Sequence, residues 1–548
     1  MNINHKSSDL SNNKIIDLIN INNADSNQST LPLITNNLLL PNTNTNITTN
    51  TTLLLPNTNT NLTNPSIIYV TKSNTNNNIE RSIDITGVTE GFNTQIEEDI
   101  YASYPLYFPK ANTILIPKKI KRNLERYVPK ELLRKIDTNI ELAIEKCLVF
   151  VSNLSSTYYS DNRWKKLKST IMHEQTKKPN SNTYVYPNII RALIKGTPKD
   201  GAIIEILKNE DGNDSYQIGV HSKYYKLSDN YFKAGLTQYI IQDESLINNR
   251  RIWLYNELKC ATDNPIASNL LSVYPRLTLP THNEMMAEAR RLISKGYINK
   301  KGKKLTMLNK HGKSYFTDAN KRSFVEENIE LYNYLTQNGF LIPSIGGIRS
   351  GGRVVDSFTL MPSWIRKMIK IDGHDIVEVD YRALHPNIAV KLYGGKSQHI
   401  THQMIADQLE VDKQIIKEAH LSFFNQKINQ MKQSPLYKYY KKKEPDMLND
   451  VMYEKRNNIS KHKVTSERLF DCEARIMSEV LRRLNSNGIY ALYVYDALYC
   501  KSIDALEVIE VMNQVALEFG VYTTANCDIP NEQLISRRNV LRALANIQ

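Results

Sequence analysis

Two aspartates stand out because each lies in or beside an apolar stretch. The segment Tyr490–Cys500, YALYVYDALYC, is apolar or aromatic at every position except Asp496. A second short β-branched run, in Asp375–Gly395, ends at Asp380. A lone buried carboxylate is costly, so it usually protonates, finds a partner or binds a metal ion. Each aspartate alone is equally compatible with a turn or a capping role, so its meaning depends on what lies near it.

Two lysines in Asp412–Gln426 have a spacing that could bind phosphate. Lys413 and Lys417 lie four residues apart, and the same spacing continues at Leu421 and Asn425. Every fourth residue drifts only ~40° around a helix, so the series follows one slowly turning face. Two ammonium groups on that face could hold a triphosphate. A solvated basic stripe is the alternative reading.

Strands and helices must position these side chains. The β-branched run before Asp380 predicts a strand, followed by a helix with Pro386 near its first turn. Ser466–Gly488 has apolar residues at helical spacing and leads directly into the stretch that holds Asp496. The basic run 299–313 is interpreted as a solvated loop.

The net positive charge of the chain lies outside residues 1–95. The 548 residues carry a formal net charge of +14, and residues 1–95 hold four Lys/Arg against six Asp/Glu. All of the positive excess therefore belongs to the rest of the chain, which favours a polyanionic partner, nucleic acid first. No apolar run approaches the ~18 residues that span a membrane. The five cysteines form no CxxC pair, which argues against a zinc site or disulfide framework.

The composition divides the chain into regions. Residues 1–95 are rich in Asn, Thr and Ser and repeat LLLPNTNTN, which predicts a disordered tail. Residues 100–265 predict an N-terminal α+β domain, in which Lys130–Val151 has helical spacing. A helix at Gly201–Leu207 followed by a hairpin at Ser215–Ser228 would be compatible with a winged-helix nucleic-acid module. An ordinary α+β packing unit explains the same pattern equally well.

The order of the later segments resembles the family A (Pol I-like) polymerases and their relatives, the single-subunit RNA polymerases. The family's first palm motif typically reads DYSQIE, and here DYRALH begins at Asp380. Its third motif reads HDE, and here YDA has Asp496 in the central place. Its fingers helix has Arg, Lys, Phe and Tyr at four-residue spacing, where this chain has Lys413, Lys417, Leu421 and Asn425.

A further stretch extends the resemblance to roughly Ser344–Gln548. GGRVVDSFTLMPSWIRK resembles the family's segment that contacts the primer-template, with Arg353 and Arg366 at the matching positions. The resemblance implies an α+β right-hand polymerase of palm, fingers and thumb. Its polymerase-like palm and fingers domain would span residues 266–548, after the smaller N-terminal α+β domain and the disordered tail.

The resemblance also implies a chemistry. Asp380 and Asp496 would hold two Mg²⁺ ions, one activating the primer 3′-hydroxyl and one neutralising the triphosphate and the leaving pyrophosphate. Lys417 would bind the incoming phosphates and protonate the pyrophosphate, and Lys413 would bind the outer phosphates. The expected partners are a DNA primer-template and nucleoside triphosphates, the expected state is a monomer, and no membrane partner is expected.

Some positions depart from the family pattern. Leu421 and Asn425 replace the family's Phe and Tyr, which puts nucleotide stacking and sugar choice in doubt. His385 stands where the DNA-making branch has a bulky Glu and the RNA-making branch a small residue. A bulky side chain there favours deoxynucleotides.

The leading expectation is a template-directed DNA polymerase without a proofreading exonuclease, serving a phage, plasmid or organellar mobile element. An RNA polymerase or primase-like enzyme on the same fold stays open. So do a catalytically inactive DNA-binding replication protein and a basic α+β protein whose motif order is coincidental. An intracellular location is expected, with the mitochondrion and the host cytoplasm both open.

Overall fold

The computed structural model describes residues 110–539, apart from 160–162, 179, 180, 182, 197–200, 210, 215–221, 233, 234, 309–320, 337–339, 530, 531 and 536–538. The expected disordered tail, residues 1–95, therefore lies outside the described residues. So does half of the hairpin expected at Ser215–Ser228.

The described residues up to Leu254 build one hydrophobic core from short helices and strands. Strands β1 and β5 pair antiparallel, and a second antiparallel sheet has the order β2-β4-β3. The elements are β1 (Thr113–Pro117), α3 (Ile120–Tyr127), α4 (Lys130–Arg134), α5 (Ile140–Ser152), η2 (Ser155–Tyr159), β2 (Lys165–Lys166), α6 (Ser169–Thr176), α7 (Tyr186–Lys195), β3 (Ile204–Ile206), β4 (Tyr224–Leu227), α8 (Asp229–Phe232) and β5 (Leu236–Ile240).

Two local expectations for this part need correction. The segment Lys130–Val151 is divided between two helices, α4 and α5. The second begins after Asn139, whose side chain caps α5 by accepting hydrogen bonds from the backbone N–H groups of Glu141 and Leu142. The segment Gly201–Leu207 contains the strand β3 instead of a helix. Its alternate isoleucines suit a strand, and β3 pairs with β4, a partner that local sequence patterns do not reveal.

Residues from Ala261 to Leu534 contribute to a second hydrophobic core. Helix α9 (Glu244–Thr262) contributes Leu254 to the first core and Ala261 to the second. The elements that follow, up to the central strand, are α10 (Pro265–Val273), η3 (Tyr274–Arg276), β6 (Leu277–Thr278), α11 (His282–Ser294), β7 (Lys304–Thr306), β8 (Arg322–Phe324), α12 (Val325–Thr336), β9 (Ser344–Ile345), η6 (Ile348–Ser350), β10 (Val354–Val355), α13 (Ser357–Leu360), α14 (Ser363–Arg366), β11 (Lys370–Ile371) and β12 (His374–Tyr381).

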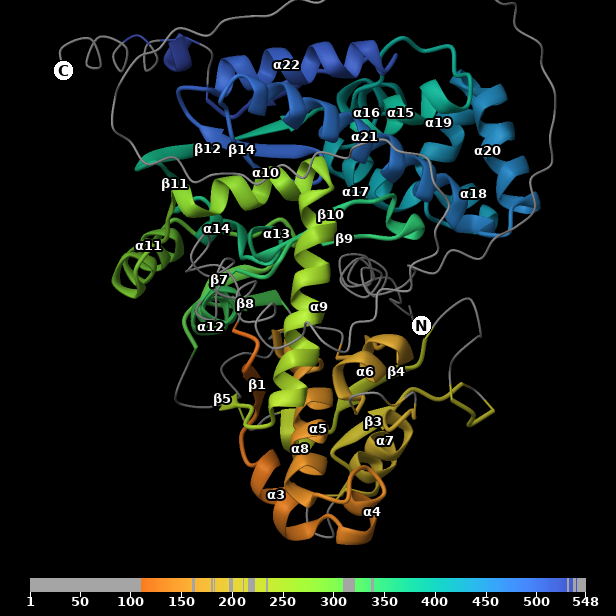
Figure 1. Cartoon of the computed structure of the whole chain (residues 1–548). Helices are drawn as coiled ribbons and strands as arrows, with labels where there is room; N and C mark the ends of the chain where they lie inside the picture. Colours follow the sequence, from red (N-terminus) through yellow and green to blue (C-terminus); the bar gives the residue numbers. More distant parts are fainter. Residues whose placement is uncertain are drawn as a thin grey trace, which may run out of the picture. The chain divides into compact units, whose positions relative to one another are not determined.

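The remaining elements surround a six-stranded sheet of order β13-β14-β12-β11-β6, with β15 also paired to β12. They are α15 (Leu384–Leu392), α16 (His402–Leu409), α17 (Lys413–Phe423), α18 (Ile428–Gln433), α19 (Pro435–Lys443), α20 (Pro445–Asn457), η7 (Lys461–Lys463), α21 (Val464–Ser486), β13 (Leu492–Val494), β14 (Ala497–Lys501), α22 (Ala505–Glu518) and β15 (Ala525–Cys527). Figure 1 shows α22 along one side of β12 and β14 and α10 along the other. The fold is therefore α+β. Among the described residues, no helix is both apolar enough and long enough to cross a membrane.

Candidate active site

The longest strand of the central sheet carries Asp380 one residue before its end. β-branched residues such as Val377 and Val379 favour this strand. Side chains alternate along a strand, so Val379 and Tyr381, which are buried, share one face. Asp380 therefore shares the other face with Glu378, and that face is only half-buried.

Asp496 lies in the two-residue turn between β13 and β14. Val494 and Ala497 pair across this turn, and Ala497 also pairs with Asp380 across β14 and β12. The residue next to Asp496 therefore lies directly opposite Asp380. The backbone N–H of Tyr381 also donates to the carbonyl of Asp496 at 3.4 Å. The sheet thus brings together two aspartates that are more than a hundred residues apart in the sequence.

The first residue of the same turn, Tyr495, has a left-handed backbone with φ 59°. Such a conformation costs a bulky residue roughly 1–3 kcal/mol and persists only where the surroundings enforce it. Here the Arg353 guanidinium lies 5.0 Å from the centre of the Tyr495 ring, and the ring of Tyr493 lies 6.3 Å away. Packing against the ring therefore holds the turn that presents Asp496.

The electrostatic surroundings disfavour charge on both aspartates. Burial and the neighbouring Asp496 carboxyl raise the pKa of Asp380 to about 8, against the opposing effect of Lys300. Burial and the Glu473 carboxylate raise the pKa of Asp496 in the same way. Without a cation, the pair therefore does not hold two negative charges at neutral pH.

The donors present fit a magnesium ion that is shared with a phosphate substrate. Asp380 Oδ1 is buried and has no hydrogen-bond partner among the described residues. Mg²⁺ prefers carboxylate oxygen and is often held by one or two carboxylates together with substrate phosphates. Within the described part of the chain, no three His, Cys, Asp or Glu side chains gather as a ligand set. A metal ion at Asp380 and Asp496 would therefore need water or phosphate oxygens to complete its coordination.

Sequence reasoning missed two charged residues beside Asp380. Lys300 Nζ donates to Glu378 Oε1 at 3.2 Å, although the Lys300 side chain is 74% exposed. The period of two along a strand could have identified Glu378, since it lies two residues before Asp380. Nothing local to the basic run 299–313 indicates that Lys300 lies near the strand, so the solvated-loop interpretation misses this contact.

A buried ion pair adjoins the two aspartates. Glu473 of α21 is fully buried, and Arg353 donates to it through Nε at 2.7 Å and through Nη2 at 2.5 Å. The Nε2 atom of His385 lies 2.7 Å from Glu473 Oε2 and 3.1 Å from Arg353 Nη2. Burial opposes the charge of Glu473, but Arg353 and His385 hold its pKa at about 2. The Glu473 carboxylate therefore stays negatively charged beside Asp496, and Arg353 provides its positive partner.

Glu473 carries a signal that the sequence reading did not use. It lies four residues after Leu469 and three before Ile476, so it interrupts the apolar face of the expected helix. A carboxylate on that face must find a buried cation. The structure supplies Arg353, whose side chain is only 7% exposed and also lies 3.7 Å from the centre of the Phe470 ring. A direct contact of Arg353 with a primer-template, as the resemblance implies, stays a prediction.

The second arginine expected to contact the primer-template, Arg366, ends α14 and is 9% exposed. Its guanidinium carbon lies 5.6 Å from the centre of the Tyr499 ring and 5.7 Å from that of Phe358. Its Nε and Nη1 atoms have no hydrogen-bond partner among the described residues. Since buried polar groups are normally paired, these two buried donors are an exception among the residues around the site.

Helix α17 places the expected phosphate-binding lysines in solvent. Lys413, Lys417 and Leu421 are exposed, and the Lys417 ammonium is close enough to lower the pKa of Asp380 against the larger effect of burial. Asn425 follows the helix and accepts a hydrogen bond from Ser466 Oγ at 3.1 Å. Lys417 is therefore electrostatically linked to the aspartate pair, whereas the Asn425 amide contacts α21.

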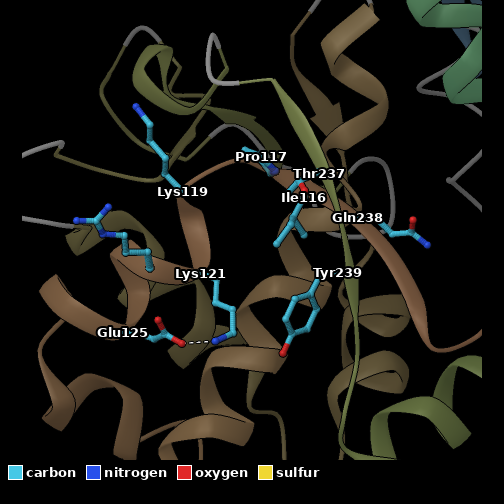
Figure 2. A pocket seen from close by; sticks show the side chains of 9 residues that line it. Ile116, Pro117, Lys119, Lys121, Glu125, Thr237, Gln238 and Tyr239 are labelled. Carbon is cyan, nitrogen blue, oxygen red and sulfur yellow. Dashed lines mark hydrogen bonds and ion pairs between the residues drawn. The ribbon is translucent and has the colours of Figure 1, made fainter.

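A cavity of ≈ 300 Å³ lies elsewhere, between β1, α3 and β5. Figure 2 shows Lys119, Lys121 and Glu125 around it, with Tyr239 contributed by β5. Lys121 forms an ion pair with Glu125. None of the residues singled out from the sequence lines this cavity.

No protein-family model and no curated protein matches this sequence. Among solved structures, one match is titled the POL domain of Pol1 from M. smegmatis in complex with DNA primer-template and dNTP. The two chains are 12% identical with a TM-score of 0.28, and the match covers 50% of this chain and 65% of that chain. This chain therefore matches less than two thirds of the length of that structure.

Proposed function

We propose that this protein is a template-directed nucleotidyltransferase that adds deoxynucleotides to the 3′ end of a primer. The observation that carries the proposal is the pair Asp380 and Asp496, which β12 and the turn before β14 hold close together, with the pKa of each carboxyl raised by partial burial and by a neighbouring carboxyl. Such a pair is unfavourable unless a cation or a proton offsets it, and perturbed carboxyls of this kind concentrate at functional sites. The order of the polymerase-like motifs along the chain agrees with this assignment.

The chain's own residues then have distinct roles. Asp380 and Asp496 would hold two Mg²⁺ ions, which supply positive charge for activating the primer hydroxyl and neutralising the triphosphate. Lys417 would bind the incoming phosphates and donate a proton to the pyrophosphate, and Lys413 would bind the outer phosphates. The free donors of Arg366 make it a further anion-binding group.

His385 is the residue proposed to favour deoxynucleotides. Its imidazole is 29% exposed and is held by Glu473 and Arg353, so it has a fixed orientation at the first turn of α15. A fixed ring discriminates against an added 2′-hydroxyl better than a mobile one, because the ring cannot turn aside without breaking the hydrogen bond that Nε2 donates to Glu473. A DNA product is therefore proposed over an RNA product.

Primer extension on a DNA template with Mg²⁺ tests the proposal, run in parallel with dNTPs and with NTPs. We expect extension with dNTPs, its loss in Asp380→Asn and Asp496→Asn, and its retention in Asp375→Asn. Asp375 is a matched control because it lies on the same strand and its side chain is 80% exposed. Extension with NTPs alone would move the protein to RNA synthesis. DNA binding without any extension would identify an inactive replication protein.

A further inference from the structure

The described residues between positions 140 and 227 include three helices and a small sheet. Helices α5, α6 and α7 contact one another, and β3 and β4 follow α7 as an antiparallel pair, with β2 on the outer side of β4. The edge of the Phe150 ring on α5 meets Tyr225 of β4, with the ring centres 5.6 Å apart. Figure 1 shows α6 and α7 grouped with β3 and β4. Helices α6 and α7 thus form a packed pair, joined by a connection longer than the about 3–4 residues of a helix-turn-helix, and the strand pair follows them along the chain.

The second helix of this pair, α7, is divided into a buried and an exposed face. Ile189, Ala192 and Leu193 are completely buried. The opposite face carries Arg191 and Lys195, both exposed. Helix α7 is therefore amphipathic: its apolar face packs into the core and its cationic face is exposed.

The two cations on this face are not neutralised by acidic neighbours. Among the described residues, neither Arg191 nor Lys195 forms an ion pair, and Arg191 donates only to Asn188, at 3.2 Å. Residues 163–196 contain eight Lys/Arg against a single acid, Glu174. Glu174 pairs with Lys177, and acids outside this range pair with two more of the cations, Lys178 with Asp137 and Arg163 with Asp229. None of these acids pairs with α7, so its two exposed cations stay complementary to phosphate.

The start of α7 is also held in place by aromatic packing. Tyr184, which is 56% exposed, stacks on His173 of α6 with ring centres 4.3 Å apart, and meets Tyr186 edge-on at 5.9 Å. These contacts join the end of one helix to the beginning of the next. The exposed face of α7 is therefore presented in one orientation, which lowers the entropic cost of docking.

We propose that the exposed face of α7 is a duplex DNA contact, distinct from the Asp380–Asp496 site, in which Arg191 and Lys195 bind the major groove and its phosphates. A helix fits the ~12 Å width of the major groove of B-DNA, and Arg can read a guanine edge bidentately while Lys contacts phosphate. A single strand offers no such groove and is usually held by stacked aromatic rings along a channel. The contact does not depend on the proposed polymerase activity.

The test is fluorescence anisotropy of a labelled 24-base-pair DNA duplex with the full chain in EDTA, titrated at several salt concentrations. The double variant R191E/K195E should bind at least tenfold more weakly. The magnitude of its slope of log affinity against log salt should also fall by roughly 1, since the phosphate contact of Lys195 is lost and each such contact contributes about 0.9. Unchanged circular dichroism would show that the fold is retained, and R191A/K195A gives the same test without introduced repulsion.

The matched control is R122E/R126E, which makes the same change in net charge at two exposed arginines of α3, a helix outside both the α6–α7 pair and the sheet. We expect this control to weaken duplex binding less than threefold. An equal loss in both double variants would overturn the proposal, because it would show attraction to the overall positive charge alone. Weaker binding of a 24-nucleotide single strand with unchanged duplex binding would also overturn it.

Discussion

Replacing Asp380 by Asn should stabilise the metal-free protein, although it removes a residue of the proposed active site. In the folded state the pKa of Asp380 is raised from 3.8 to about 8 by burial and by Asp496. The folded state therefore binds a proton more tightly than the unfolded chain. The contribution of Asp380 to stability is therefore fully present below pH ~4, falls as the pH rises from 3.8 towards 8, and is lost above that range. Asparagine carries no charge and removes this loss.

The magnitude follows from the size of the shift. Each pKa unit corresponds to 1.36 kcal/mol, so a rise of about four units would cost roughly 5 kcal/mol at pH 8 or above if one carboxyl carried all of it. Burial is the larger cause of the shift and would also disfavour the polar amide of Asn, so Asp380→Asn should recover only part of this cost, roughly 2–3 kcal/mol at pH 8. This gain raises the unfolding midpoint by a few degrees.

The assay is thermal unfolding of the full chain in EDTA between pH 5 and pH 9. The wild-type midpoint should fall across this range, and that of Asp380→Asn should fall less. Asp375→Asn is the control, since its side chain on the same strand is 80% exposed and pairs only with the exposed Lys370. It should follow the wild type, because exposed ion pairs contribute little.

Two results would refute this reasoning. Equal pH dependence in the wild type and Asp380→Asn would mean that the two carboxyls are not held together in a buried pair. A lower midpoint for Asp380→Asn at pH 8 would mean that the carboxylate makes favourable contacts within the fold, in which case a structural role would replace the proposed metal-binding one.

Four further outcomes are expected. Adding Mg²⁺ should raise the wild-type unfolding midpoint more at pH 8 than at pH 6, because binding requires ionised carboxyls; equal shifts would argue against a site at this pair. Glu473→Gln should lower stability by about 3–5 kcal/mol in thermal unfolding, since it leaves a buried guanidinium unpaired, and a loss below 1 kcal/mol would contradict this. Gly351→Ala should destabilise far more than Gly352→Ala: both have positive φ, but the new methyl group at Gly351 would lie 2.2 Å from a backbone nitrogen of α21, whereas at Gly352 it meets open space. In primer extension, Lys417→Ala should lower kcat about 10²-fold and Lys413→Ala should mainly raise KM; the reverse order would exchange the proposed roles.

The sequence determined much of this protein's local structure. The β-branched run at Asp380, the apolar stretch around Asp496 and the four-residue spacing from Lys413 to Leu421 each lie on an element of the expected type, whereas Asn425 lies beyond the end of α17. Short-range periodicity is sufficient for this, because the alternation of a strand and the turn of a helix are properties of neighbouring residues. The sequence alone therefore identified Asp380, Asp496 and the two lysines of α17 as residues to test.

Only the tertiary structure decided which of these residues meet. Pairing of β12 with β14 sets Asp380 beside Asp496, and no local pattern contains that register. The same packing buries Arg353 against Glu473 and brings Lys300 to Glu378, neither of which the sequence indicated. It also places the strand β3 within Gly201–Leu207, since the isoleucines there find a partner strand in β4. Local spacing fixes the side on which a residue lies, but burial and charge depend on partners that are distant in the chain.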